Sequence, residues 1–121
     1  MPILLQQTES GEVIQHQMTK ATLTIGRRQD NDIVLYDGFV SRLHATLEKK
    51  GDRYVIKDND STFGTFVNEE RITEKEIKYG DSIRFGTNIS ITFVDEGTIE
   101  GIKSIIREKE EPPSLKKISA V

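Results

Sequence analysis

Short apolar segments separated by turn-forming sequences make up most of residues 1–95. The clearest alternation of apolar and polar positions falls at Ile83 and Phe85, and then at Ile89, Ile91 and Phe93. Less regular apolar segments occupy residues 3–6, 13–18, 22–25, 33–35, 45–49 and 54–57. Apolar residues at every second position are typical of strands with one buried face. Because such segments recur roughly every 8–12 residues, the pattern predicts an all-β sandwich or barrel, with no helix before residue 97.

Residues 98–121 follow a different pattern. The isoleucines of this segment have helical spacing, at positions 99, 102, 105 and 106, and a pair of prolines at 112 and 113 would end a helix. We therefore predict one domain over residues 1–97 and a C-terminal tail or linker over residues 98–121. Two interpretations of the tail stay open: a short helix that packs on the sandwich or frays in solvent, and a linker or partner-binding helix.

Composition and charge narrow the function classes. A chain of 121 residues with 35% hydrophobic side chains suits one modest core. The 17 basic and 20 acidic side chains give a net charge of −3, whereas duplex-binding domains carry a basic excess. The absence of cysteine excludes disulfides, thiol catalysis and cysteine-based zinc sites. No apolar run reaches the roughly 18–20 residues of a membrane span. We expect a cytoplasmic protein that binds neither nucleic acid nor membranes.

Three polar clusters stand out from the predicted strands, at residues 26–33, 41–45 and 58–65. Each lies where a strand ends and a loop begins, and binding residues concentrate on loops that a rigid scaffold positions. If the three loops meet at one end of the sandwich, their side chains form a small cup of hydrogen-bond donors. The alternative is three ordinary loops that are rich in turn-forming residues.

The donors in these clusters suit a phosphate group. Cationic donors come from Arg27, Arg28 and Arg42, and a guanidinium group can meet two phosphate oxygens at once. Hydroxyl donors come from Ser41, Ser61 and Thr62. Arg28 either helps to bind phosphate or lies in solvent.

The order of these motifs resembles the forkhead-associated (FHA) domain family. The chain carries Gly-Arg, then Asn-Asp-Ile, then Ser-Arg-x-His-Ala, then Asp-x-x-Ser-Thr-x-Gly-Thr-x-Val-Asn, and the match extends over about residues 1–95. The resemblance implies an FHA-type β-sandwich of eleven strands that binds phosphothreonine peptides through loops at one end. It also implies no catalysis, and we expect no cofactor and no metal.

Four residues match the family positions that bind phosphothreonine. Arg27 matches the arginine that contacts the phosphate, and Ser41 matches the serine whose hydroxyl holds a phosphate oxygen. Thr62 matches the threonine whose hydroxyl and backbone amide meet the phosphate. Arg42 occupies a position where the family uses a polar or basic side chain to touch phosphate or peptide backbone.

Four further residues match family positions that shape the loops. These are Gly26, His44, Gly64 and Asn68, and for Asn68 the resemblance implies a role in stabilising a turn.

Phe63 is the main departure from the family pattern, which has asparagine between this threonine and glycine. The family asparagine hydrogen-bonds the peptide backbone, and a phenylalanine side chain cannot do so. The lost contact is worth roughly 0.5–1.5 kcal/mol. Phe63 can instead offer an apolar surface to a peptide side chain or a partner protein. A smaller departure is Glu69, where the family often has glycine.

Two other chemistries have partial signals in the same residues. Ser41 and His44 are three residues apart, but the sequence has no Gly-x-Ser-x-Gly motif to support a nucleophilic serine. The spacing of Asp58, Asp60 and Thr62 is similar to part of a calcium-binding EF-hand loop. The position that needs glycine there holds Phe63. We therefore expect neither catalysis nor a metal site.

The sequence as a whole predicts a phosphothreonine-dependent recognition module in Ser/Thr-kinase signalling. Its partner is then a protein or peptide that contains phosphothreonine. Two alternatives stay open: a module that binds partner proteins without phosphate, and a regulatory domain of a larger protein. A further possibility is self-binding, in which a phosphorylated residue of the chain occupies the site of the same or another copy. The candidate residues are Thr8, Thr98, Ser104 and Ser119.

Overall fold

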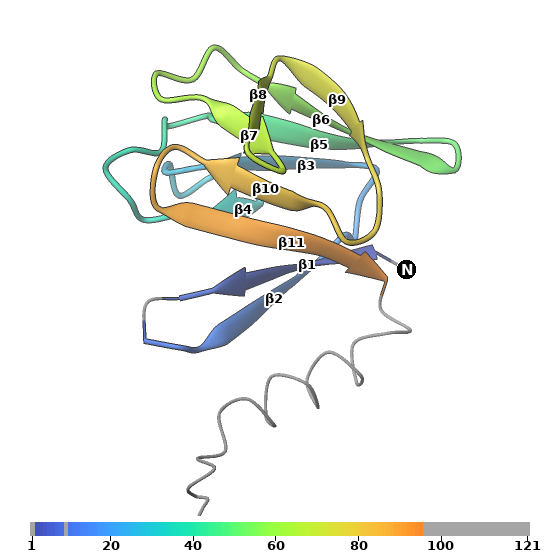
Figure 1. Ribbon diagram of the computed structural model, residues 1–121, viewed down its shortest axis with the longest axis horizontal. Coiled ribbons are helices and arrows are strands. Elements are labelled where there is room, and N and C mark those ends of the chain that lie inside the picture. The colour runs from blue at the N-terminus through green and yellow to red at the C-terminus, as the bar shows by residue number, and fades with distance from the viewer. Residues whose placement is uncertain (1, 9, 96–121) are drawn as a thin grey trace, which may run out of the picture.

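The computed structural model describes residues 2–8 and 10–95, which form two facing β-sheets (Figure 1). The eleven strands of the described residues are β1 (Pro2–Gln7), β2 (Val13–Gln17), β3 (Thr22–Gly26), β4 (Ile33–Val34), β5 (Ala45–Lys50), β6 (Arg53–Asp58), β7 (Thr65–Val67), β8 (Glu70–Ile72), β9 (Glu74–Ile77), β10 (Ser82–Phe85) and β11 (Ile89–Asp95). The predicted all-β sandwich of about eleven strands is thus confirmed. The predicted tail and the boundary at residue 97 lie outside the described residues.

Each sheet mixes strands that are close and distant in the sequence. One sheet has six strands in the order β2-β1-β11-β10-β7-β8, and the other has five in the order β4-β3-β5-β6-β9. Strands β3 and β4 pair in parallel, and the other strand pairs of the described residues are antiparallel. Among the described residues, no helix is long and apolar enough to cross a membrane.

The core fills the space between the two sheets. Alternate residues of β10 and β11 point inward, and Ile83, Phe85, Ile91 and Phe93 are at most 1% exposed. They pack against apolar side chains of the other sheet, such as Leu47 of β5. Burial of this apolar surface is the main favourable term in folding.

Three strands were missed by the sequence pattern, namely β7, β8 and β9. Strands β8 and β9 are the outer strands of their sheets, and they carry mostly charged, exposed side chains. Strand β7 has only three residues, too few to display a period of two. Edge strands with charged side chains are common because they discourage pairing with other chains.

Several loops lie at one end of the sandwich. Strand β3 runs toward this end, and the β4–β5, β6–β7 and β10–β11 loops lie there as well, on the left of Figure 1. The three polar clusters of the sequence fall in or next to these loops.

Candidate functional site

Main-chain hydrogen bonds join the loops at this end. The Arg27 amide donates to the Ser41 carbonyl at 3.0 Å, which connects the end of β3 to the β4–β5 loop. The Asn59 amide donates to the His44 carbonyl at 2.9 Å, which brings in the β6–β7 loop. These contacts bring the three polar clusters together, as the sequence analysis required for a common site.

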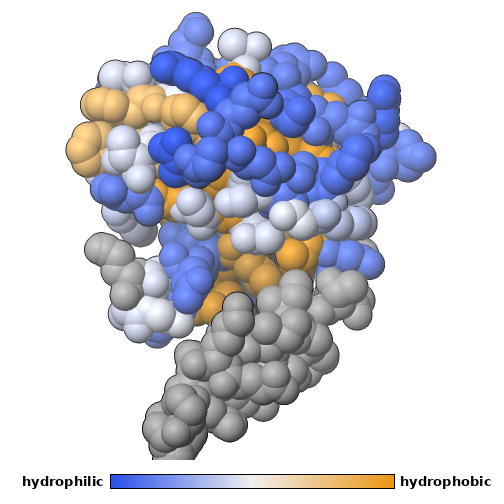
Figure 2. All heavy atoms as spheres, in the orientation of Figure 1, coloured by the Kyte–Doolittle hydropathy of each residue, from blue (hydrophilic) through white to orange (hydrophobic). Residues whose placement is uncertain are grey.

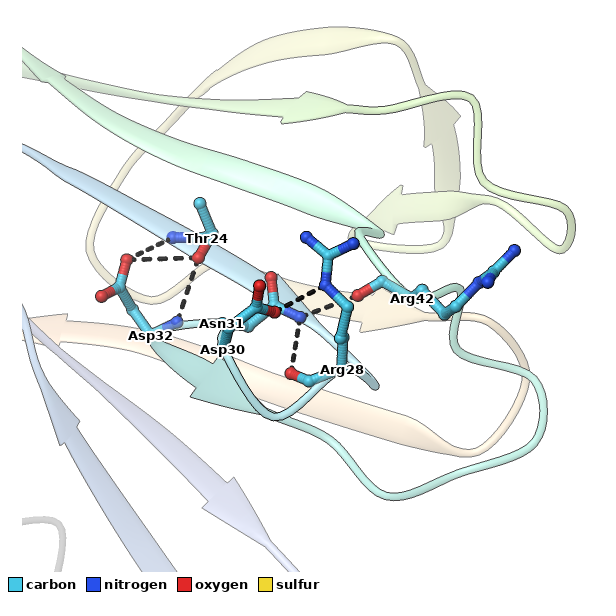
Figure 3. Close-up of polar contacts among 6 residues, drawn as sticks. All are labelled: Thr24, Arg28, Asp30, Asn31, Asp32 and Arg42. Atoms are coloured by element: carbon cyan, nitrogen blue, oxygen red, sulfur yellow. Dashed lines mark hydrogen bonds and ion pairs between the residues drawn. The ribbon is translucent and has the colours of Figure 1, made fainter.

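Asn31 locks the β3–β4 loop against the β4–β5 loop. Its side-chain amide donates to the carbonyls of Arg28 at 2.8 Å and Arg42 at 2.7 Å, and the residue is only 8% exposed. Figure 3 shows these two bonds, with the Arg42 side chain extending away from the other labelled residues. The close approach also depends on Gly26, because a Cβ atom there would collide with the Arg42 carbonyl.

Asp32 anchors the far side of the same loop. Its carboxylate accepts hydrogen bonds from the Thr24 amide at 2.9 Å and the Thr24 hydroxyl at 3.2 Å, both drawn in Figure 3. It also pairs with the Lys20 ammonium at 2.6 Å. The Lys20 contact and the Thr24 amide lower the pKa of Asp32, because both favour the charged carboxylate.

His44 connects the β4–β5 loop to the β6–β7 loop through both ring nitrogens. The side chain is fully buried, and its Nδ1 accepts a hydrogen bond from the Ser41 amide at 3.0 Å. Nδ1 therefore carries no proton, so Nε2 donates to the Gly64 carbonyl at 2.8 Å. Burial lowers the pKa of His44, against the opposing contributions of Gly64 and the Asp58 charge. The geometry and the pKa direction agree on a neutral imidazole.

Asp58 shapes the β6–β7 loop from within. Its carboxylate accepts hydrogen bonds from the Ser61 amide at 3.1 Å, the Ser61 hydroxyl at 2.5 Å and the Thr65 hydroxyl at 2.6 Å. The Ser61 hydroxyl in turn accepts from the Gly64 amide at 3.0 Å. Gly64 has a φ of +94°, a conformation that glycine adopts without steric cost.

Ser41 and Thr62 meet across the two loops although they are 21 positions apart in the sequence. The Thr62 amide donates to the Ser41 Oγ at 3.1 Å. The family resemblance implied that both the amide and the hydroxyl of Thr62 meet phosphate. In this structure the amide is bonded to Ser41, and the Thr62 hydroxyl has no partner among the described residues.

The three arginines of the clusters differ in their surroundings. Arg28 pairs with the Asp30 carboxylate at 2.6 Å. Arg27 donates from Nε to the Val40 carbonyl at 3.0 Å, and within the described residues no carboxylate pairs with Arg27 or Arg42. Two uncompensated positive charges therefore lie in these loops.

Phe63 contacts a second exposed aromatic side chain, Phe39 of the β4–β5 loop. The two ring centroids are 5.0 Å apart and the rings are nearly perpendicular. Sequence reasoning missed Phe39, whose only signal was an aromatic residue in a loop of turn-forming residues.

Asn68 lies away from the loop cluster, in the turn between β7 and β8. Its side chain donates to the Asp81 carboxylate at 3.0 Å and accepts from the Ser82 amide at 3.0 Å. The neighbouring Glu69 pairs with Arg84 at 3.0 Å, and Arg84 lies over the Phe66 ring. Both residues at this turn have positive φ.

The described residues contain no group of three or more His, Asp or Glu side chains that could hold a metal ion. The structure is a two-sheet β-sandwich with cationic and hydroxyl donors in the loops of one end. Residues 23–86, more than half of the chain, match the family model described as the FHA domain. The chain therefore belongs to the FHA domain family.

Known proteins similar to this chain include the oxoglutarate dehydrogenase inhibitor of Corynebacterium jeikeium. It is 39% identical over 57% of this chain, which corresponds to 48% of that protein. The chain spans less than half of the curated relatives that it matches, from 9% for a Mycobacterium tuberculosis ABC transporter protein to the 48% above.

Solved structures with the same fold include complexes with phosphopeptides. A structure from a study of phosphothreonine-dependent FHA domain interactions has a TM-score of 0.69 and 32% identity, and covers 78% of this chain and 96% of its own. EmbR of Mycobacterium tuberculosis, in complex with a low-affinity phosphopeptide, has a TM-score of 0.67 and 35% identity. This match covers 76% of the present chain and 24% of EmbR.

Proposed function

We propose that this chain is a phosphothreonine-peptide recognition module. One observation carries the proposal: the guanidinium groups of Arg27 and Arg42 have no carboxylate partner among the described residues. They lie in loops that also present the hydroxyls of Ser41 and Thr62. Uncompensated arginines beside hydroxyl donors are suited to a dianionic ligand with several acceptor oxygens.

Each of the four residues has a distinct role in this proposal. Arg27 supplies charge and a bidentate contact, with its Nε already fixed on the Val40 carbonyl. Ser41 donates its hydroxyl hydrogen to one phosphate oxygen while its Oγ accepts from the Thr62 amide. The Thr62 hydroxyl contacts a second oxygen, and Arg42 reaches phosphate or peptide backbone.

The comparisons support a peptide as the ligand. The solved relatives include FHA domains studied for phosphothreonine-dependent interactions and an FHA protein in complex with a phosphopeptide. We place the module in cytoplasmic Ser/Thr-kinase signalling, where phosphothreonine is generated. The family preference for threonine over serine implies a small apolar pocket for the threonine methyl group.

The proposed activity is recognition and not catalysis. His44 is the one histidine near the donors, and both of its ring nitrogens are bonded within the loop framework. A buried imidazole with this arrangement holds the loops together and is not positioned as a base toward a ligand.

The test is a titration of a degenerate phosphothreonine peptide library against the wild-type chain. We expect a Kd of roughly 1–100 µM, because a few charge-assisted bonds must offset the ordering of a flexible peptide. The Arg27→Ala variant should weaken binding by about 10- to 100-fold. Arg28→Ala serves as a matched control, because it removes a neighbouring arginine that is paired with Asp30.

Unphosphorylated and phosphoserine peptides complete the design. Equal affinity for phosphorylated and unphosphorylated peptides would contradict the proposal, provided that the chain is folded. An equal loss in Arg27→Ala and Arg28→Ala would indicate general charge attraction and would contradict the assigned role of Arg27.

A second candidate function is partner binding that does not depend on phosphate. The exposed pair of Phe39 and Phe63 favours it, because Phe63 replaces the family asparagine that clamps the peptide. Phosphatase treatment of a captured partner separates the two: loss of binding supports phosphothreonine recognition, and retained binding supports the alternative. In either case the domain can act as the regulatory part of a larger protein.

A further inference from the structure

Phe39 and Phe63 form an exposed aromatic pair at the loop end of the molecule. Phe39 is 40% exposed and Phe63 is 43% exposed, and their rings meet edge to face at 5.0 Å. Figure 2 shows hydrophobic side chains at the end of the molecule where the β4–β5 and β6–β7 loops lie in Figure 1. Single exposed apolar side chains are common on proteins, whereas contiguous ones often mark a binding surface.

The aromatic pair adjoins the proposed phosphate site through the chain itself. Phe39 directly precedes Val40, whose carbonyl accepts from Arg27. Phe63 directly follows Thr62, whose amide donates to Ser41. An extended peptide advances about 3.3–3.6 Å per residue. We therefore expect a ligand anchored by its phosphate to reach the pair within about two residues.

Phe39 of this pair is held in place by two contacts of its backbone. The Phe39 amide donates to the Asp37 carboxylate at 2.8 Å, which fixes the tip of the β4–β5 loop. Gly86 of the β10–β11 loop packs against the Phe39 backbone, where a Cβ atom would collide with the Phe39 carbonyl. A surface that is ordered before binding loses less conformational freedom when a ligand binds.

We propose that the aromatic pair selects phosphothreonine peptides with a large apolar side chain within two residues of the phosphothreonine. The inference rests on the proposed phosphothreonine function and deepens it by naming the class of peptide. The occupant is a peptide side chain, because the surface is continuous with the phosphate site. The apolar contact between this side chain and the aromatic pair replaces the hydrogen bonds that the family asparagine makes to the peptide backbone.

The experiment compares phosphothreonine peptides by fluorescence anisotropy. One peptide has alanine at the two positions on each side of the phosphothreonine, and the others carry leucine or phenylalanine at one of those positions. The wild-type chain should bind at least one apolar peptide about tenfold more tightly than the alanine peptide, which half-burial of an apolar side chain can supply. Phe39→Ala should reduce that preference to about twofold or less.

Binding of the alanine peptide serves as the internal control. Phe39→Ala should leave this affinity within about twofold of wild type, and the retained binding shows that the variant is folded. Phe63→Ser provides a second variant on the other loop, with the same expected loss of preference. Tyr36→Ala is the matched control, because Tyr36 is an aromatic residue of the β4–β5 loop, like Phe39, and is 75% exposed. This variant should keep the wild-type preference for apolar peptides.

The outcomes separate the two proposals. Equal affinity of the wild-type chain for the alanine and apolar phosphopeptides overturns the aromatic selection and leaves the phosphothreonine function intact. A preference that survives in both Phe39→Ala and Phe63→Ser also overturns it. A folded wild-type chain that binds no phosphopeptide at all overturns the proposed function, and the aromatic selection falls with it.

Discussion

His44 is a side chain whose role depends on its protonation state. As a neutral imidazole it accepts from the Ser41 amide and donates to the Gly64 carbonyl. Protonation of Nδ1 would turn this acceptor into a donor, which would then face the Ser41 amide, itself a donor. The Ser41–His44–Gly64 link therefore exists only while the imidazole is neutral.

We predict that the free energy of unfolding falls as the pH decreases from 7 to 5, in part because of His44. Burial lowers the native pKa of His44, whereas the unfolded chain takes up the proton near the ordinary histidine pKa of about 6.5. Below that pH the unfolded state binds more protons, so stability falls by at most about 1.4 kcal/mol per pH unit for this group. Urea unfolding at several pH values measures the slope.

The His44→Gln variant isolates this contribution. It should be less stable than wild type at pH 7 and should show a shallower decrease of stability between pH 7 and 5. His16→Gln measures the contribution of the other histidine separately, because burial also lowers the pKa of His16. Identical slopes in wild type and His44→Gln would show that the imidazole does not titrate as argued.

Some residues of the site were predictable from the sequence and others were not. Arg27, Ser41 and Thr62 belong to motifs with a recognisable order, and the structure places them in adjacent loops. Phe39 belongs to no motif, and its contact with Phe63 depends on how two loops fold together. Contacts between side chains that are far apart in the sequence leave no local pattern.

At the scale of elements, strands were predictable where burial imposes alternation. The β10–β11 hairpin shows the period of two because each strand presents one face to the core. The edge strands β8 and β9 show no such period because their side chains are mostly exposed. The eleven-strand count came from the family resemblance and not from the hydrophobic pattern.

The junction between β3 and the β4–β5 loop gives a prediction for a pair of glycines. Gly26→Ala should destabilise the protein by about 1–3 kcal/mol, because the new Cβ atom would meet the Arg42 carbonyl and the Asn31 side chain. Gly38→Ala should change stability by less than about 0.5 kcal/mol, because no atom beyond the neighbouring residues of the chain lies within 4 Å of the new Cβ. Urea denaturation of both variants provides the comparison, and equal effects would contradict the close approach.

At the scale of the whole molecule, the first strand of the described chain, β1, pairs with the last, β11. β11 ends at Asp95, which pairs with Pro2 at the start of β1, and the core residues of the described chain lie between Ile3 and Val94. Both ends of the described sandwich therefore meet at one place on the same sheet.

We predict that a chain ending at residue 97 keeps its thermal midpoint within about 3 °C of the full chain. The expectation follows from the pairing of β1 with β11 and from the core that the two sheets enclose between them. Since 1 kcal/mol corresponds to roughly 4–8 °C for a domain of this size, calorimetry resolves the difference. A decrease of more than about 5 °C would show that residues 98–121 stabilise the fold.

Part of the loop framework uses main-chain atoms of residues whose side chains face solvent. The Arg42 carbonyl accepts from the Arg28 amide and the Asn31 side chain, while the Arg42 guanidinium takes no part. Thr62 likewise contributes its amide, and Phe63 makes no hydrogen bond within the framework. Side chains at positions 42 and 63 can therefore be exchanged while the loops keep their shape. Substitutions at these exposed positions would therefore give a set of binding domains that share one fold and differ in the peptides they select.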